Sequence, residues 1–311
     1  MSDSNFRLGF ACALAAISAA RALAQEPAPP ADGEPPGGIE EVVVRGQRMS
    51  EIDDELRIYI RDFIGEVVKT PQGRGYARWH RQVCVGVHNL QSDAAQYIVD
   101  RISALALEVG LEPEEPGCAP DVLVIFTTDG AQLATTMVEN EPRLFRPGGP
   151  MPDMTLSRAA LEDFKSSQRA VRWWHVSMPV DARTGQGAVA VPQAGGRYPT
   201  IAVDGPSFIH SGIRDDLRYV IIIVDGTKLS GTTWQQIADY LAVVSLAQVS
   251  PDANPEAFDS ILNLFANPKA YSGLTDWDRS YVHALYEFDQ RRTPRGQTSD
   301  LVDEMARREL D

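Results

Sequence analysis

Three long segments of the chain repeat apolar residues at helical spacing. Within residues 53–69 an apolar residue returns every three or four positions, which predicts a helix with one buried face. The same spacing runs through residues 92–109, where Ser92 is a candidate N-cap and Gly110 provides a stop signal. Residues 232–249 are apolar over most of the helical surface, which is typical of a helix in the middle of a domain.

Shorter helices are predicted at residues 131–140, 157–167 and 275–288. The last of these opens with Thr275 and has Asp278 three residues later, which is the arrangement of a capping box. These helices alternate along the chain with segments of strand character.

Two continuous apolar runs of strand length, residues 121–127 and 218–224, predict strands that are buried on both faces. Further strands are predicted at residues 79–88 and 171–180, at the three valines 42–44, and in a hairpin of residues 188–191 with 200–203. Strand, helix and strand follow one another over residues 79–127, as in a crossover unit. The fold class expected from this order is α/β (α+β), with a mixed sheet and packed helices.

The N-terminal residues have the plan of a secretory signal peptide. Arg7 precedes an apolar run of about 13 residues, which is too short to cross a bilayer, and the small residues Ala22 and Ala24 suit a signal peptidase. We therefore expect cleavage after Ala24, a periplasmic or secreted protein, and no transmembrane segment after cleavage.

The remaining chain divides by composition. Residues 25–38, which follow the signal peptide (1–24), are dominated by Pro and Gly and predict a flexible linker. A single α/β domain is expected over residues 39–290. Residues 291–311 are strongly charged and are expected to form a peripheral helix or a frayed tail.

The cysteines support export. Cys12 is lost with the signal peptide, and the even pair that remains, Cys84 and Cys118, is most simply a disulfide in an oxidising compartment. The alternative is two buried thiols. The spacing of the pair does not match a zinc knuckle.

The charge balance narrows the function. The chain carries 29 Lys plus Arg against 43 Asp plus Glu, a formal net charge of -14, whereas a nucleic-acid binder needs a basic surface. A hydrophobic fraction of 43% is enough to build a core, so a wholly disordered chain is not expected.

Motifs for catalysis are sparse. No Gly-x-Ser-x-Gly or Ser-x-x-Lys pattern occurs, and the Gly-x-Gly-x-x-Ala match at residues 185–190 leads into a predicted strand, so it is interpreted as a glycine turn. No two histidines have the spacing by which one element offers two metal ligands. A metal site from separate elements, such as His175 with His210, stays open as an alternative.

One resemblance comes from the C-terminal third. The strand RYVIIIVDGTKL, the helix TTWQQIADYLAVVSLAQV, a loop with Ser260-Ile261-Leu262 and the helix LTDWDRSYVHALYEF resemble the ordered parts of a zincin metallopeptidase. In zincins an edge strand precedes a helix with a His-Glu-x-x-His motif. Here Ala238 and Ala242 occupy the histidine positions and Asp239 the glutamate position, so the resemblance implies a pseudoenzyme without zinc or another cofactor.

Two other resemblances concern export and partners. Arg78-Trp79, the stretch around Cys84 and GCAPDVLVIFTTD resemble a class of exported proteobacterial proteins for which no reaction is known. EVVVRGQR at residues 41–48 is similar to the segment that follows the signal in TonB-dependent receptors, which offer a strand to a partner. The chain is too short for the barrel of such a receptor, so these residues are either a partner handle or the first strand of the domain.

The sequence therefore favours a non-catalytic protein of the cell envelope. We expect it to bind an envelope protein or a small ligand through a degenerate peptidase-like cleft, with Asp239, Tyr240 and His210 as candidate binding residues. One alternative is a metal-dependent hydrolase with ligands from separate elements. The other is a TonB-box-like adaptor.

Overall fold

The computed structural model describes residues 39–71, 73–145, 156–187, 189–193, 196–200 and 211–310. The predicted signal peptide, the predicted linker and His210 lie outside the described residues. The chain divides after Arg48 into two units, and the sheet, the cores and the sites described here all belong to the unit that begins at Met49.

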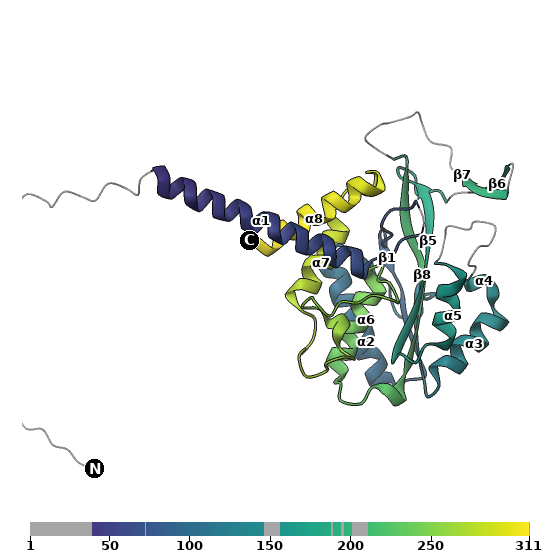
Figure 1. Cartoon of the computed structure of the whole chain (residues 1–311). Helices are drawn as coiled ribbons and strands as arrows, with labels where there is room; N and C mark the ends of the chain where they lie inside the picture. Colours follow the sequence, from purple (N-terminus) through teal and green to yellow (C-terminus); the bar gives the residue numbers. More distant parts are fainter. Residues whose placement is uncertain are drawn as a thin grey trace, which may run out of the picture. The chain divides into compact units, whose positions relative to one another are not determined.

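A four-stranded mixed sheet forms the centre of this unit (Figure 1). Its order is β2 (Val85–His88), β4 (Val122–Thr127), β8 (Ile213–Asp225) and β5 (Val171–Asp181). The first three strands are parallel, and β5 pairs with β8 in the antiparallel direction with a register shift at Val176/Ser177. The mixed sheet predicted from the sequence is thereby confirmed.

Both faces of the sheet are covered by helices. On one side lie α2 (Ser92–Glu108), α6 (Trp234–Leu246) and α7 (Asp276–Glu287), and on the other lie α3 (Gly130–Asn140), α4 (Pro142–Phe145) and α5 (Arg158–Ser166) (Figure 1). Alternate residues of β8 enter the two cores: Val220, Ile222 and Val224 belong to the larger core, and Ile221 and Ile223 to the smaller one. This explains why the strand is a continuous apolar run instead of an alternating one.

Two small sheets complete the strands. β1 (Gln82–Val83) pairs in parallel with β3 (Glu112–Pro113), and β6 (Val189–Gln193) forms an antiparallel hairpin with β7 (Gly196–Thr200). The hairpin predicted from the sequence is present, but its second strand begins earlier than residues 200–203, of which 201–203 lie outside the described residues. The predicted disulfide is confirmed: Cys84, between β1 and β2, is bonded to Cys118 in the loop before β4.

The strand predicted at Val42–Val44 is wrong. These valines lie in α1 (Ile39–Val67), a helix that runs without a break into the segment where helical spacing was recognised. β-Branched residues cost only about 0.5 kcal/mol each in a helix, and no proline separates the valines from the strongly periodic segment that follows. The buried stripe of that segment, Ile60, Ile64 and Val67, is as predicted.

The charged C-terminal segment is a helix, one of the two forms expected, but it is not peripheral. It forms α8 (Pro294–Leu310), and four of its apolar residues enter the larger core: Leu301, Val302, Met305 and Ala306. The spacing of these residues places them on one face of the helix, while the charged residues occupy the others.

The remaining elements are two short 3₁₀ helices, η2 (Gly226–Lys228) after β8 and η3 (Ile261–Asn263) between α6 and α7. Within the part of the chain that the structure describes, no helix combines the length and the apolar composition needed to span a membrane.

Candidate functional site

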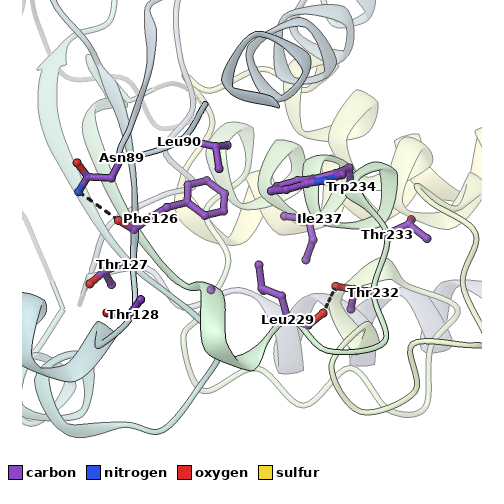
Figure 2. Close-up of a pocket in the computed structure, with 11 residues that line it drawn as sticks. Asn89, Leu90, Phe126, Thr127, Thr128, Leu229, Thr232, Thr233, Trp234 and Ile237 are labelled. Carbon is purple, nitrogen blue, oxygen red and sulfur yellow. Dashed lines mark hydrogen bonds between the residues drawn. The ribbon is translucent and has the colours of Figure 1, made fainter. Parts of the chain in front are cut away.

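A cavity lies where the carboxyl ends of the three parallel strands meet the start of α6. We call it the α6 pocket; its volume is about 770 Å³, and Figure 2 shows its lining. The lining residues come from the ends of β2, β4 and β8 and from the first turn of α6: Asn89, Leu90, Phe126, Thr127, Thr128, Gly226, Leu229, Thr232, Thr233, Trp234 and Ile237. The volume lies within the range that is usual for small-ligand sites.

The loop after β2 forms one wall of the pocket. Asn89 has a backbone φ of 60°, a left-handed conformation that asparagine tolerates better than most residues, and its Nδ2 donates a hydrogen bond to the carbonyl oxygen of Phe126 at 3.2 Å. This bond fixes the loop after β2 to the end of β4, and Leu90 of the loop and Phe126 of the strand both line the pocket (Figure 2).

The opposite wall is held by the cap of α6. The Thr233 hydroxyl accepts a hydrogen bond from the backbone N–H of Gln236, and the Gln236 side chain accepts one from the backbone N–H of Thr233, which makes a capping box. The Gln236 amide also donates to the carbonyl oxygen of Pro268 at 2.8 Å. Just before the cap, the Thr232 hydroxyl donates to the carbonyl oxygen of Leu229 at 2.7 Å.

Two aromatic rings face each other across the pocket. The centroids of Phe126 and Trp234 are 6.2 Å apart, and the rings are tilted by 54° (Figure 2). Phe126 is buried, whereas the indole of Trp234 is 48% exposed. Of the five tryptophans in the chain, the other four are buried, so Trp234 is the exception.

The floor near η2 is anchored by Asp225, a buried residue at the end of β8. Its carboxylate accepts hydrogen bonds from the Thr227 hydroxyl at 2.6 Å and from the Gly130 backbone N–H at 3.4 Å, and it forms an ion pair with Lys228 at 3.1 Å. Burial favours the neutral acid, but these hydrogen bonds and the lysine outweigh it, and the pKa of Asp225 is lowered. Asp225 therefore stays ionised and joins β8 to the start of α3.

The chemistry that the pocket offers is apolar contact with a few neutral polar groups. Its described lining consists of aliphatic and aromatic side chains, threonine hydroxyls, one amide and backbone groups. Such a surface binds by burial of apolar area, and its hydroxyls and amide orient the ligand.

Two of the residues predicted as a binding site, Asp239 and Tyr240, lie inside the core. The Asp239 carboxylate is 2% exposed; it forms an ion pair with Arg101 of α2, whose Nε is 2.9 Å away, and it accepts the backbone N–H of Leu274 at 2.9 Å. A Cβ at Gly273 would collide with this carboxylate. The space beside Asp239 is therefore filled by the protein itself.

Tyr240 packs between aromatic rings. Its ring centroid is 5.1 Å from that of Phe265 and 6.1 Å from that of Trp173. Burial raises the pKa of its hydroxyl well above the ordinary value, so the phenol stays neutral. Tyr240 does not line the α6 pocket.

The α6 helix lacks the donor atoms that hold the zinc ion in an active zincin. Ala238 and Ala242, both buried, have no donor atom, and the carboxylate of Asp239 is already bound to Arg101 and Leu274. In the described part of the chain, the grouping of potential metal ligands is Cys84, Glu114 and Cys118, and its two sulfurs are joined to each other.

His175, the other candidate metal ligand, is buried between β5 and α6. Its Nε2–H donates to the carbonyl oxygen of Val244 at 2.8 Å, and burial lowers its pKa to about 4. The imidazole is thus neutral and committed to the packing of α6 against the sheet. Its proposed companion His210 lies outside the described residues.

Sequence reasoning missed the α6 pocket. Its signal was present: Asn89, Thr128 and Gly226 each follow directly after a strand. Ligands of open α/β sheets bind outside the carboxyl ends of parallel strands. That rule requires the strand order, which periodicity does not provide.

Comparison of the chain with protein-family models, with curated proteins and with solved structures gave no match.

Proposed function

We propose that this protein is an exported, non-catalytic binding protein that holds an uncharged, apolar group of a small ligand or of an envelope partner in the α6 pocket. The observation that carries the proposal is the half-exposed indole of Trp234 at the mouth of a mainly apolar cavity. A ligand that covers this indole removes apolar surface from water, which is the main source of affinity at such sites.

The composition of the lining supports an uncharged ligand group. A charged group would lose its hydration in the pocket, and no acidic or basic side chain is among the described lining residues to compensate for that loss. The amide of Asn89 and the hydroxyls of Thr127 and Thr128 stand at the ends of β2 and β4, where they can bind a neutral polar group of the ligand.

The zincin resemblance stays part of the proposal: α6 would be the counterpart of the zinc-binding helix, and its two histidine positions hold Ala238 and Ala242. Within that resemblance, the binding cleft moves from the middle of α6, which is filled around Asp239, to its N-terminal end. One departure concerns the strand before the helix: β8 is an interior strand, and β5 occupies the edge.

Export is supported by two features. The first is the signal-peptide pattern of residues 1–24, and the second is the disulfide between Cys84 and Cys118, because such bonds persist in oxidising compartments. A binding protein of the envelope meets its ligands in that compartment.

The proposal is tested with N-phenyl-1-naphthylamine, an uncharged aromatic probe that becomes fluorescent in apolar surroundings. We expect saturable binding to the wild-type protein, and binding weaker by up to about tenfold in Trp234→Ala, which removes the aromatic contact. The tryptophan emission of the protein should also change on binding. The change can be assigned to Trp234, because the other four tryptophans are buried.

The matched control is Leu107→Ala on α2, a residue that is 63% exposed and outside the pocket. It removes exposed apolar surface without touching the site, so its affinity for the probe should equal that of the wild type. Equal affinity in Trp234→Ala, or no saturable binding to the wild-type protein, would contradict the proposed function.

A further inference from the structure

A second cavity, of about 380 Å³, lies between the C-terminal half of α1, Thr70 with residues 74–76, and the start of α8. Three arginines line it, Arg61, Arg74 and Arg295, although the chain as a whole has a net charge of -14. The hydroxyl groups of Thr70, Tyr76 and Thr298 also belong to the lining. We call this cavity the arginine pocket.

Two of the three arginines have no ionic partner among the residues that the structure describes. Arg74 forms an ion pair with the buried Asp215, whose other oxygen accepts the backbone N–H of Gly75 at 2.9 Å. By contrast, Arg61 and Arg295 are exposed to solvent and form no ion pair with any residue in the described part of the chain. One turn before Arg61, Arg57 is paired with both Asp53 and Asp303.

The position of Arg295 adds to the positive potential. It is the second residue of α8, and the first turn of this helix has no acidic residue. The N-terminus of a helix carries a partial positive charge, so an unpaired arginine there is unfavourable for the helix itself. Proteins break such local rules mainly at functional sites, where a ligand compensates for the unfavourable residue.

Gly65 provides an independent observation. It lies inside α1, where glycine is less favourable than alanine. A Cβ at this position would meet no atom within 4 Å, so the packing of the protein does not require glycine. Gly65 lines the arginine pocket on the same face of α1 as Arg61, and its missing side chain leaves that space to a ligand.

From these observations we infer that the arginine pocket binds a divalent oxyanion, a phosphate monoester or a dicarboxylate. The guanidinium groups of Arg61 and Arg295 bind its oxygens from the two helices, since arginine matches both groups in planar, paired geometry. The backbone N–H of Arg295 is one further donor, because Pro294 has no N–H and the N–H of Gly296 already donates to the Thr293 hydroxyl at 3.3 Å. This site is separate from the α6 pocket, with which it shares no residue.

The test is isothermal titration of the full protein with inorganic phosphate and, separately, with succinate, at constant ionic strength in chloride. We expect millimolar or tighter binding of at least one of the two, which also tells a phosphate ligand from a dicarboxylate. In Arg61→Gln and in Arg295→Gln the affinity should fall at least about tenfold, because each change removes a charged hydrogen-bond donor.

Two further variants separate a ligand site from a general charge effect. Gly65→Leu keeps every charge and fills the pocket, so it should abolish binding while the folded protein persists, as judged by circular dichroism. Arg279→Gln, which removes an exposed arginine that is paired with Glu108 on another surface, should leave the affinity unchanged. If neither anion binds the wild-type protein, or if the pocket variants bind as the wild type does, the inference is wrong.

Discussion

At the scale of single residues, His175 shows how burial fixes a protonation state. The imidazole is buried between β5 and α6, where its Nε2–H donates to the Val244 carbonyl oxygen. Burial disfavours the charged form more than this hydrogen bond favours it, which lowers the pKa to about 4.

The resulting prediction concerns acid stability. The unfolded chain binds the proton of His175 near pH 6.5 and the folded chain only near pH 4, so this residue's contribution to stability is complete above pH 6.5 and is lost as the pH falls toward 4. The loss amounts to about 3 kcal/mol. His175→Gln, whose amide can also donate to Val244, should lose less stability than the wild type between these pH values in urea unfolding. Parallel pH curves for the two proteins would show that His175 titrates normally.

Other single residues show what local sequence can predict. The Thr275 and Asp278 capping box forms as expected, with the Asp278 carboxylate also accepting the backbone N–H of Ile261 at 2.8 Å. Gly110 ends α2 with a φ of 80°. Ser92, in contrast, is not the cap of α2, because the helix begins one residue earlier than this assignment requires and Gln91 occupies the N-cap position. A helix cap depends on a few neighbouring residues, so its predicted position is wrong by one residue at most in these three cases.

At the scale of elements, α8 is the clearest departure from the sequence prediction. Its 17 residues contain many charges, and this composition obscured the stripe formed by Leu301, Val302, Met305 and Ala306. The helix packs against α7 and inserts the stripe into the larger core. Charge content describes the exposed faces of a helix and says little about the buried one.

This placement predicts the effect of a substitution in the charged segment. Leu301 is fully buried, so Leu301→Ala should lower the free energy of unfolding by about 2 to 5 kcal/mol. Leu310→Ala, in the last turn of the same helix and 46% exposed, should change it by less than about 0.5 kcal/mol. Urea unfolding of both variants measures the difference. Similar small effects would mean that α8 is peripheral, as its composition suggested.

The same limit applies to α1. Helical spacing identified its second half, and the three valines of the first half were assigned to a strand because β-branched residues are frequent in strands. The strand propensity of single residues is a weak preference. Here the valines are part of the same helix as the periodic segment that follows them. The long apolar runs correctly predicted the strands β4 and β8. Burial on both faces holds for β8, whereas β4 alternates between buried and partly buried residues.

At the scale of the whole molecule, the candidate sites follow from how distant segments meet. The α6 pocket exists because the ends of β2, β4 and β8 are neighbours in the sheet, although about 140 residues of chain separate the first from the last. The candidates chosen from the sequence, Asp239 and Tyr240, were selected by their place in a helix motif, and the structure gives both of them partners within the core. Periodicity predicts which faces are buried, but it does not predict which surfaces remain open.

The central claim, that the α6 pocket binds an uncharged apolar group, is tested most directly by methyl NMR of the protein titrated with N-phenyl-1-naphthylamine. We predict that the methyl signals of Leu90, Leu229 and Ile237 shift together and saturate at one equivalent of probe, while those of Leu161, on the opposite face of the sheet, stay in place. Shifts confined to methyl groups outside the pocket, or no shifts at all, would contradict the account.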